Sequence, residues 1–153
     1  MLAYLVQHGK AKTKDEDPDR PLTDEGRKEV EAVMLLAQRF GAITASRVVH
    51  SGKRRAAETA ELIASKLEAD VEAAPGLDPD DDPAIWAGRL GEADRDLVVV
   101  GHLPHLERLT SFLLCGNPDA GVVRFANGGV VCLSGDGGGW TLQWAITPAL
   151  VQE

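Results

Sequence analysis

The amino-acid sequence predicts a three-layer α/β/α domain built on a mixed, mainly parallel sheet. Three observations lead to this fold class. Two apolar runs, at residues 2–7 and 97–100, each end at a turn and a histidine, as strands buried on both faces of a sheet do. Segments with helical periodicity follow these runs. The last part of the chain alternates short apolar segments with glycine-rich turns, which is typical of antiparallel hairpins placed beside a parallel sheet.

Length and composition indicate a soluble globular protein. With 153 residues the chain is near the usual size of one domain, and we expect a single domain over residues 1–153. No apolar run approaches the roughly 18 residues of a membrane span, and the first run is too short for a secretory leader. We therefore expect a cytoplasmic protein. The net charge of −8 argues against a nucleic-acid partner. Cys115 and Cys132 indicate neither a disulfide framework nor a metal site.

The first strand, over residues 2–7, delivers His8 to its own end. Gly9 then lets the backbone turn sharply. Residues 10–21 are polar and contain two prolines, so they are predicted to form a loop. In α/β proteins, ligands bind in the crevice outside the carboxyl ends of the strands. This stretch therefore places a histidine where a ligand would bind.

A first helix and a second strand-helix pair follow. Thr23 is a suitable N-cap, and apolar residues recur at helical spacing until Gly41. Gly26 in the first turn is costly by helix propensity, so we expect another segment to pack closely against it. The second strand is predicted over residues 47–50 and the second helix over about 53–67.

The remaining elements alternate less regularly. Residues 71–83 are rich in Asp and Pro and are predicted to form a loop, followed by a short helix over 84–90. Residues 96–102 repeat the pattern of a buried strand followed by a histidine, and Pro104 precedes a third main helix. Three antiparallel strands are expected in the tail, over residues 122–126, 130–134 and 140–146.

Three strand-to-helix junctions carry the residues that can perform chemistry. His8 and His102 each follow a strand, and in this fold the carboxyl ends of parallel strands share one edge of the sheet, so the two histidines can face each other. Between them in sequence, Ser51 turns out of the second strand and could cap the second helix. Arg55 and Thr59 lie on one face of that helix. An arginine in a first helical turn is unfavourable with the helix dipole unless it serves an anion.

At these positions the sequence resembles the histidine phosphatase superfamily, which has the phosphoglycerate mutase-like fold. Four groups of residues carry the resemblance in the right order: Gln7-His8-Gly9, Leu22-Thr23 with Gly26, Ser51 with Arg55-Ala56 and Thr59, and Gly101-His102. The short chain and the segments 20–23 and 101–104 look most like the bacterial phosphohistidine phosphatases of the SixA type.

The resemblance implies that His8 is a nucleophile that becomes phosphorylated, that Arg55 and His102 bind the phosphoryl group, and that neither a metal nor another cofactor is used. Two positions depart from the family pattern. Gln7 stands where the family has arginine, and Lys10 stands where an acidic residue is common. We expect Lys10 to replace part of the missing positive charge; the alternative is a solvated loop lysine. The residues expected to bind substrate are Gln7, Gly9, Lys10, Arg20 and Ser51.

Elementary chemistry supports the same assignment. A neutral imidazole is a good nucleophile towards phosphorus because its pKa lies near 6.5, and a phosphohistidine is labile enough for water to complete the hydrolysis. His8 must be unprotonated to attack. Phosphoryl transfer also requires neutralisation of the charge on the phosphoryl oxygens, to which Arg55, a protonated His102 and helix N–H groups would contribute.

The absence of a long insertion predicts an open cleft, and an imidazole leaving group needs less acid assistance than an alcohol. We therefore expect the substrate to be a phosphohistidine on a protein of the histidine-containing phosphotransfer type, in signal transduction. A small phosphate ester is the second choice. With Gln7 in place of arginine, a catalytically weak module that binds a phosphorylated ligand is a third. We expect no nucleic-acid or membrane partner, and a monomer or weak dimer.

Two further groupings leave alternatives open. His102 and His105 could form a metal site with His8, but no third ligand lies at metal spacing, so phosphate binding is favoured. The four aspartates within residues 78–82 could include a proton donor, although such a cluster in a loop is usually solvated surface. No role is assigned to His50.

Overall fold

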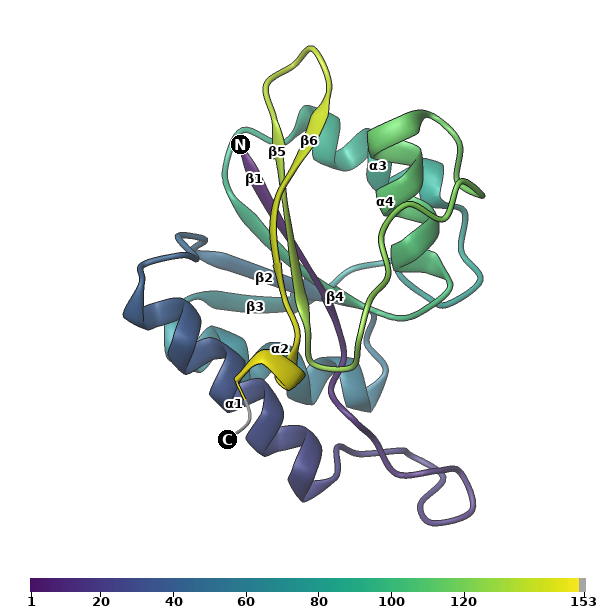
Figure 1. The fold of residues 1–153 in the computed structure, drawn as a ribbon. Helices are drawn as coiled ribbons and strands as arrows, with labels where there is room; N and C mark the ends of the chain where they lie inside the picture. The colour runs from purple at the N-terminus through teal and green to yellow at the C-terminus, as the bar shows by residue number, and fades with distance from the viewer. Residues whose placement is uncertain (152–153) are drawn as a thin grey trace.

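The computed structural model of the chain describes residues 1–151, which form one six-stranded sheet with helices on both of its faces (Figure 1). The strands lie in the order β3-β2-β4-β1-β5-β6. Their bounds are β1 Leu2–Gln7, β2 Arg47–His50, β3 Asp70–Ala73, β4 Leu97–Gly101, β5 Val130–Gly135 and β6 Trp140–Ile146. The first four strands are mutually parallel, whereas β5 and β6 pair antiparallel. The predicted mixed, mainly parallel sheet and α/β/α layering are confirmed.

The helices are divided between the two faces of the sheet (Figure 1). The helices are α1 Asp24–Arg39, α2 Arg54–Leu67, α3 Pro83–Glu92, α4 His105–Cys115 and the short 3-10 helix η1 Pro148–Leu150. One core packs α1 and α2 against one sheet face, and the other packs α3 and α4 against the opposite face. Side chains alternate along each strand, so Tyr4 and Val6 enter the first core while Ala3 and Leu5 enter the second. Within residues 1–151, none of the helices has the length and apolar character that a membrane crossing requires.

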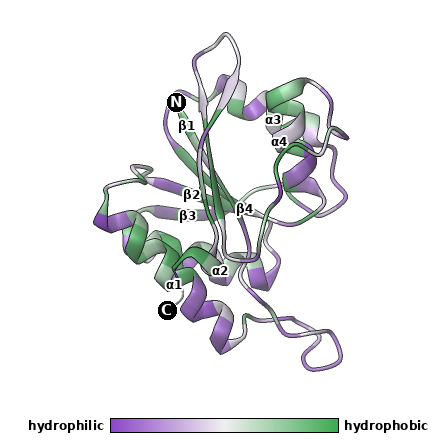
Figure 2. Ribbon diagram, in the orientation of Figure 1, coloured by the Kyte–Doolittle hydropathy of each residue, from purple (hydrophilic) through white to green (hydrophobic). Residues whose placement is uncertain are grey.

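The central strands β1 and β4 are largely apolar, whereas the loop between β1 and α1 is mostly polar (Figure 2). β1 and β4 lie side by side in the middle, and all five residues of β4 are buried. Their register places Gln7 opposite Gly101. The residues that follow, His8 and His102, therefore leave the sheet next to each other at its carboxyl edge.

The loop between β1 and α1 is fastened to the first turn of α1. Thr23 caps the helix by accepting a hydrogen bond from the Gly26 N–H at 3.0 Å. A Cβ atom on Gly26 would lie only 2.2 Å from the Lys10 carbonyl oxygen, so a side chain cannot be accommodated there. The close packing expected at Gly26 is confirmed. At the base of the loop, the Lys12 N–H also donates to the Pro21 carbonyl at 2.8 Å.

Several local predictions were wrong for physical reasons. The loop expected over 71–83 begins with β3, whose four residues are all exposed at the sheet edge, so no buried apolar run marks this strand in the sequence. The strand expected over 122–126 does not form, because side chains of α4 take up its backbone donors. Ser111 accepts from the Val122 N–H and Glu107 from the Phe125 N–H.

Two helix starts also differ from the sequence prediction. The N-cap of α2 is Lys53, with no side-chain hydrogen bond at that position, so Ser51 is not the cap. The short helix predicted over 84–90 begins earlier, at Pro83, because the Asp82 carboxylate caps it by accepting from the Ala84 N–H at 2.9 Å.

Candidate active site

His8 lies at the carboxyl end of β1 and is only 8% exposed. Its Nδ1 is 2.7 Å from the Gly9 carbonyl oxygen. A carbonyl can only accept a hydrogen bond, so Nδ1 carries the hydrogen of the neutral ring and Nε2 keeps its lone pair. The Asn127 side chain donates to the His8 carbonyl at 3.0 Å and holds the backbone at this point. His8 is thus oriented with one nitrogen fixed and the other available as a nucleophile.

His102 follows β4, and its ring centroid is 5.1 Å from that of His8, with 51° between the ring planes. The side chain is 1% exposed. Its Nε2 is 2.6 Å from the Ser51 hydroxyl oxygen. Its Nδ1 is buried and has no hydrogen-bond partner among residues 1–151. A buried polar atom without a partner is costly, which is a reason to expect a ligand there.

Arg55 approaches the same place from the first turn of α2. Its Nε is buried and finds no hydrogen-bond partner in the described part of the chain. Burial and the nearby positive charge of Arg20 lower the pKa of Arg55. An anion bound at this position would hydrogen-bond the buried guanidinium and would offset its repulsion from Arg20.

Both histidines are neutral near pH 7. Burial lowers the pKa of His8 to about 4, and the charges of Arg55 and Arg20 act in the same direction, against the hydrogen bond to Gly9. Burial also lowers the pKa of His102 to about 3, aided by His8, Arg55, Lys53 and His105. The neutral nucleophile expected at His8 agrees with this. The protonated His102 expected from the sequence does not, because burial and the surrounding positive charges lower the pKa of that ring.

Comparison with known proteins identifies the family. A model of the histidine phosphatase superfamily (branch 1) matches residues 3–79, which hold the first three of the four motif groups. The chain belongs to the histidine phosphatase superfamily. A search of curated protein sequences found no match.

Solved structures of histidine phosphatases share the whole fold. The protein histidine phosphatase SixA complexed with tungstate is 25% identical, with a TM-score of 0.87 over 99% of this chain and 100% of that one. A putative phosphohistidine phosphatase SixA from Agrobacterium tumefaciens is 20% identical, with a TM-score of 0.79 over 96% and 97%. A putative alpha-ribazole-5'-P phosphatase from Escherichia coli K-12 is 18% identical, with a TM-score of 0.80 over 97% and 98%. These neighbours include phosphatases named for different substrates.

The first departure from the superfamily pattern, Gln7, lies beside the two histidines. Its Oε1 is buried and lacks a hydrogen-bond partner among residues 1–151. The side chain is neutral, so the positive charge supplied by arginine in the family must come from elsewhere. Arg20 is one source, because its charge acts on both His8 and Arg55. Arg20 has a φ of 50°, uncommon for a residue other than glycine, and its Nε donates to the Lys12 carbonyl at 3.0 Å.

The second departure, Lys10, is paired with carboxylates of α1. Its ammonium group lies 2.8 Å from Glu25 and 3.5 Å from Glu29, both on α1. Neither His8 nor His102 has its pKa shifted by Lys10, whereas Arg20 acts on His8 and Lys53 acts on His102. The charge of Lys10 is thus shared with two carboxylates, and its replacement of the missing arginine charge stays a prediction.

Gly9 also differs from expectation. Its backbone N–H donates to the Thr59 hydroxyl at 3.0 Å, and a Cβ atom there would meet Val30 at 3.1 Å and the Gly26 carbonyl at 3.2 Å. The glycine is needed for packing against α1, and its N–H is not left for a ligand. The structure thus gives Gly9 a role in positioning the site.

The remaining histidines have separate surroundings. The His50 Nδ1 accepts a hydrogen bond from the Gly52 N–H at 3.0 Å, which stabilises the turn after β2. His105 is fully buried, and burial lowers its pKa. Within residues 1–151, no three His, Cys, Asp or Glu side chains come together in a way that could hold a metal ion. The grouping of His8, His102 and His105 therefore does not form the metal site considered from the sequence.

Sequence reasoning missed two residues of this site. Lys53 belongs to a run of three basic residues that opens α2, and that run was the available signal. Asn127 gave no signal of its own, because an asparagine before two glycines usually marks a turn.

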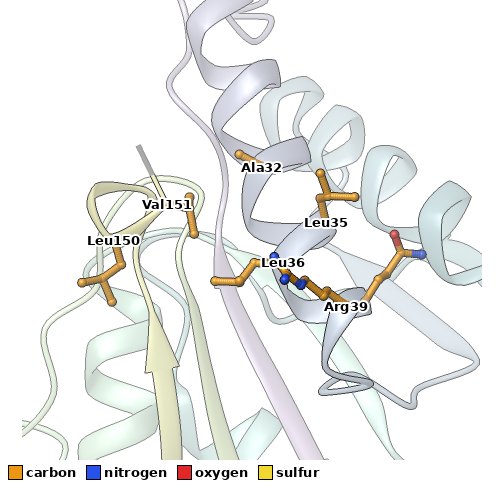
Figure 3. Close-up of a pocket in the computed structure, with 7 residues that line it drawn as sticks. Ala32, Leu35, Leu36, Arg39, Leu150 and Val151 are labelled. Atoms are coloured by element: carbon orange, nitrogen blue, oxygen red, sulfur yellow. The ribbon is translucent and has the colours of Figure 1, made fainter. Parts of the chain in front are cut away.

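An apolar groove of ≈ 720 Å³ lies apart from the site, between α1 and the C-terminal η1 (Figure 3). Leu35 and Leu36 of α1 line it together with Leu150 and Val151. It contains none of the candidate catalytic residues.

Proposed function

We propose that the protein is a phosphohistidine phosphatase, which removes the phosphoryl group from a histidine of another protein through a phosphorylated His8. The observation that carries the proposal is the pairing of His8 with two unsatisfied groups. The His8 Nδ1 is fixed by the Gly9 carbonyl, while the nearby His102 Nδ1 and Arg55 Nε are buried and lack hydrogen-bond partners among the described residues 1–151. A phosphoryl group bound between them would satisfy both donors.

In the first step, the lone pair on the His8 Nε2 attacks phosphorus as the bond to the substrate imidazole breaks. The electron pair of that bond stays on the substrate nitrogen, which then takes up a proton. Arg55 and Arg20 offset the negative charge of the phosphoryl oxygens. The hydrogen bond from the His8 Nδ1 to Gly9 stabilises the positive charge that develops on the ring during attack.

In the second step, water attacks phosphorus and the bond to the His8 Nε2 breaks. The electron pair returns to His8, and the product is inorganic phosphate. Over both steps, one hydrogen of the water ends on the substrate imidazole and the other on phosphate. His8 is left neutral, as it began, because its pKa of about 4 disfavours protonation at neutral pH.

The leaving group supports a phosphohistidine over an ester. The charged groups that shift the pKa of His8 are the arginines Arg55 and Arg20, which suit a phosphoryl group but cannot serve as a proton donor to an alcohol. An alcohol leaving group would need a positioned acid, whereas an imidazole departs near neutral pH with much less assistance. A small phosphate ester is the second candidate, and Asp78 favours it. The carboxylate of Asp78 is close enough to Arg55 to raise the pKa of that arginine and could provide the acid.

The decisive experiment compares two substrates with one enzyme preparation. A histidine-containing phosphotransfer domain phosphorylated with phosphoramidate, and an aryl phosphate in parallel, are incubated with the protein, and phosphate release is measured in single turnover. We expect faster release from the phosphorylated domain and acid-labile phosphate on the enzyme. Preferential hydrolysis of the aryl phosphate that is lost in Asp78→Asn would show that the substrate is a phosphate ester. Tight binding of either substrate without turnover would show a binding module.

Metal use is tested in the same assay. The superfamily resemblance implies a metal-independent reaction, so EDTA should leave the rate unchanged. A rate that EDTA removes and a divalent ion restores would contradict the proposed mechanism. His8→Ala is the matched control for both measurements.

A further inference from the structure

The Ser51 hydroxyl lies between two nitrogen atoms. Its oxygen is 2.6 Å from the His102 Nε2 and 3.2 Å from the backbone nitrogen of Lys53. The backbone N–H of Lys53 can only donate, so the Ser51 oxygen accepts there. The hydrogen bond between Ser51 and the His102 Nε2 can run in either direction, because a neutral imidazole nitrogen either donates or accepts.

The hydroxyl hydrogen decides this direction. Among residues 1–151, the His102 Nε2 is the only acceptor that the Ser51 hydroxyl contacts. If Nε2 donated instead, the Ser51 oxygen would receive two hydrogen bonds and its own hydrogen would have no protein acceptor. Donation from Ser51 to Nε2 gives the Lys53 N–H, the Ser51 hydroxyl hydrogen and the His102 Nε2 one partner each. The hydrogen of the neutral His102 ring must then be on Nδ1.

We propose that Ser51 is a positioning residue that holds the neutral His102 in its Nδ1–H form, making that ring a hydrogen-bond donor to the phosphoryl group without an added proton. The inference rests on the proposed function for its consequence, but not for the tautomer itself. The His102 Nδ1 is buried and has no hydrogen-bond partner within residues 1–151. As an N–H it can donate to a phosphoryl oxygen.

The surroundings explain why such an arrangement is useful. The groups that act on His102 are His8 from β1, Arg55 and Lys53 from the start of α2, and His105 from α4, and all of them oppose a positive charge on its ring. A neutral donor avoids that repulsion. Ser51 thereby loses the substrate-binding role expected from the sequence, since its only hydrogen is committed to His102.

Nitrogen NMR of the free protein tests the tautomer directly. In a sample labelled with ¹⁵N-histidine, ring nitrogens with and without hydrogen have separate shifts, and His102→Gln identifies the His102 signals. At pH 7.5 we expect a protonated Nδ1 and an unprotonated Nε2. Ser51→Ala should mix the two forms, whereas Ser51→Thr keeps a hydroxyl and should restore the single form. A protonated Nε2 in the wild-type protein would overturn the proposal.

Kinetics test the consequence for the reaction. In His102→Asn the amide N–H can reach the Nδ1 position, whereas in His102→Gln it reaches the Nε2 position. We expect His102→Asn to keep a kcat/KM roughly tenfold above that of His102→Gln, because only the former retains the donor towards phosphate. Equal values, or the reverse order, would contradict the donor role.

Failure of this inference can be told from failure of the proposed function. The NMR experiment contains no substrate, so the tautomer can be correct even if phosphohistidine is not the substrate. The kinetic comparison uses whichever of the two substrates the wild-type protein turns over. Circular dichroism melting of each variant separates loss of the donor from loss of the fold.

Discussion

His8 and His102 are the same residue type at the ends of adjacent parallel strands, yet their rings are tied in opposite ways. His8 is fixed through Nδ1 by a backbone carbonyl, whereas His102 is held through Nε2 by the Ser51 side chain. Burial lowers the pKa of both rings. Because burial and charge act alike on both rings, the ring nitrogen that is hydrogen-bonded is what distinguishes them, and under the proposed function it leaves the His8 Nε2 to attack phosphorus and the His102 Nδ1 to bind the phosphoryl group.

The largest effect should come from the ring that attacks. His8→Ala removes the nucleophile, so kcat/KM should fall at least about 10⁴-fold and acid-labile phosphate on the enzyme should disappear. Rapid-quench assays measure both quantities. An unchanged thermal melt would confirm that the fold remains. Turnover near the wild-type rate would show that His8 is not the nucleophile, and the proposed difference in role between His8 and His102 would then be wrong.

The charge of Arg55 acts on both His8 and His102, and its removal should have the next largest effect. Arg55→Ala should lower kcat/KM about a hundredfold, about 3 kcal/mol, because a charged hydrogen bond to the phosphoryl group is lost. Arg55→Lys keeps the charge without the planar fork and should give an intermediate value. A loss of less than about fivefold in Arg55→Ala would place the phosphoryl group elsewhere.

The pH dependence sharpens the comparison, because attack requires a neutral His8. The pKa of His8 is about 4, so kcat/KM should be flat near neutrality, fall as pH drops through about 4, and be about tenfold lower one unit below that value. A kcat/KM that falls already at pH 6.5 would contradict a neutral His8.

The lowered pKa values of His8 and His102 also predict that the protein loses stability in acid. The unfolded chain takes up protons at these histidines from about pH 6.5 downwards, before the folded protein does. Urea midpoints should therefore decrease as pH falls below about 6.5, and midpoints that stay constant down to pH 4 would contradict the lowered pKa values.

The smallest effects distinguish the two loop cations. Arg20→Ala should raise the inhibition constant for inorganic phosphate several-fold, and the effect should shrink at high salt. Lys10→Ala, its matched control, should change that constant by less than about twofold, because an ammonium ion paired with carboxylates has little charge left for a ligand. A larger effect at Lys10 than at Arg20 would restore the interpretation drawn from the sequence.

The sequence was most informative where burial imposes a pattern. The apolar runs of β1 and β4 and the histidines after them predicted both the centre of the sheet and the neighbouring positions of His8 and His102. The exposed strand β3 gave no such pattern, and residues 122–126 look like a strand although side chains of α4 bind their backbone. The direction of a long loop side chain depends on tertiary partners, which is why the ion pairs of Lys10 with Glu25 and Glu29 could not be predicted from the sequence.

The loop between β1 and α1 is closed by hydrogen bonds at its base and exposed to solvent at its tip. Pairing of Ala11 with Leu22 and the hydrogen bond from Lys12 to Pro21 join its two arms, and residues 13–16 are exposed. A clamped base isolates the core from changes in chain length beyond it. The tip can accept insertions while β1, α1 and His8 keep their positions. Related chains could thus acquire new substrates by exchanging this one segment, with the reacting histidines inherited unchanged.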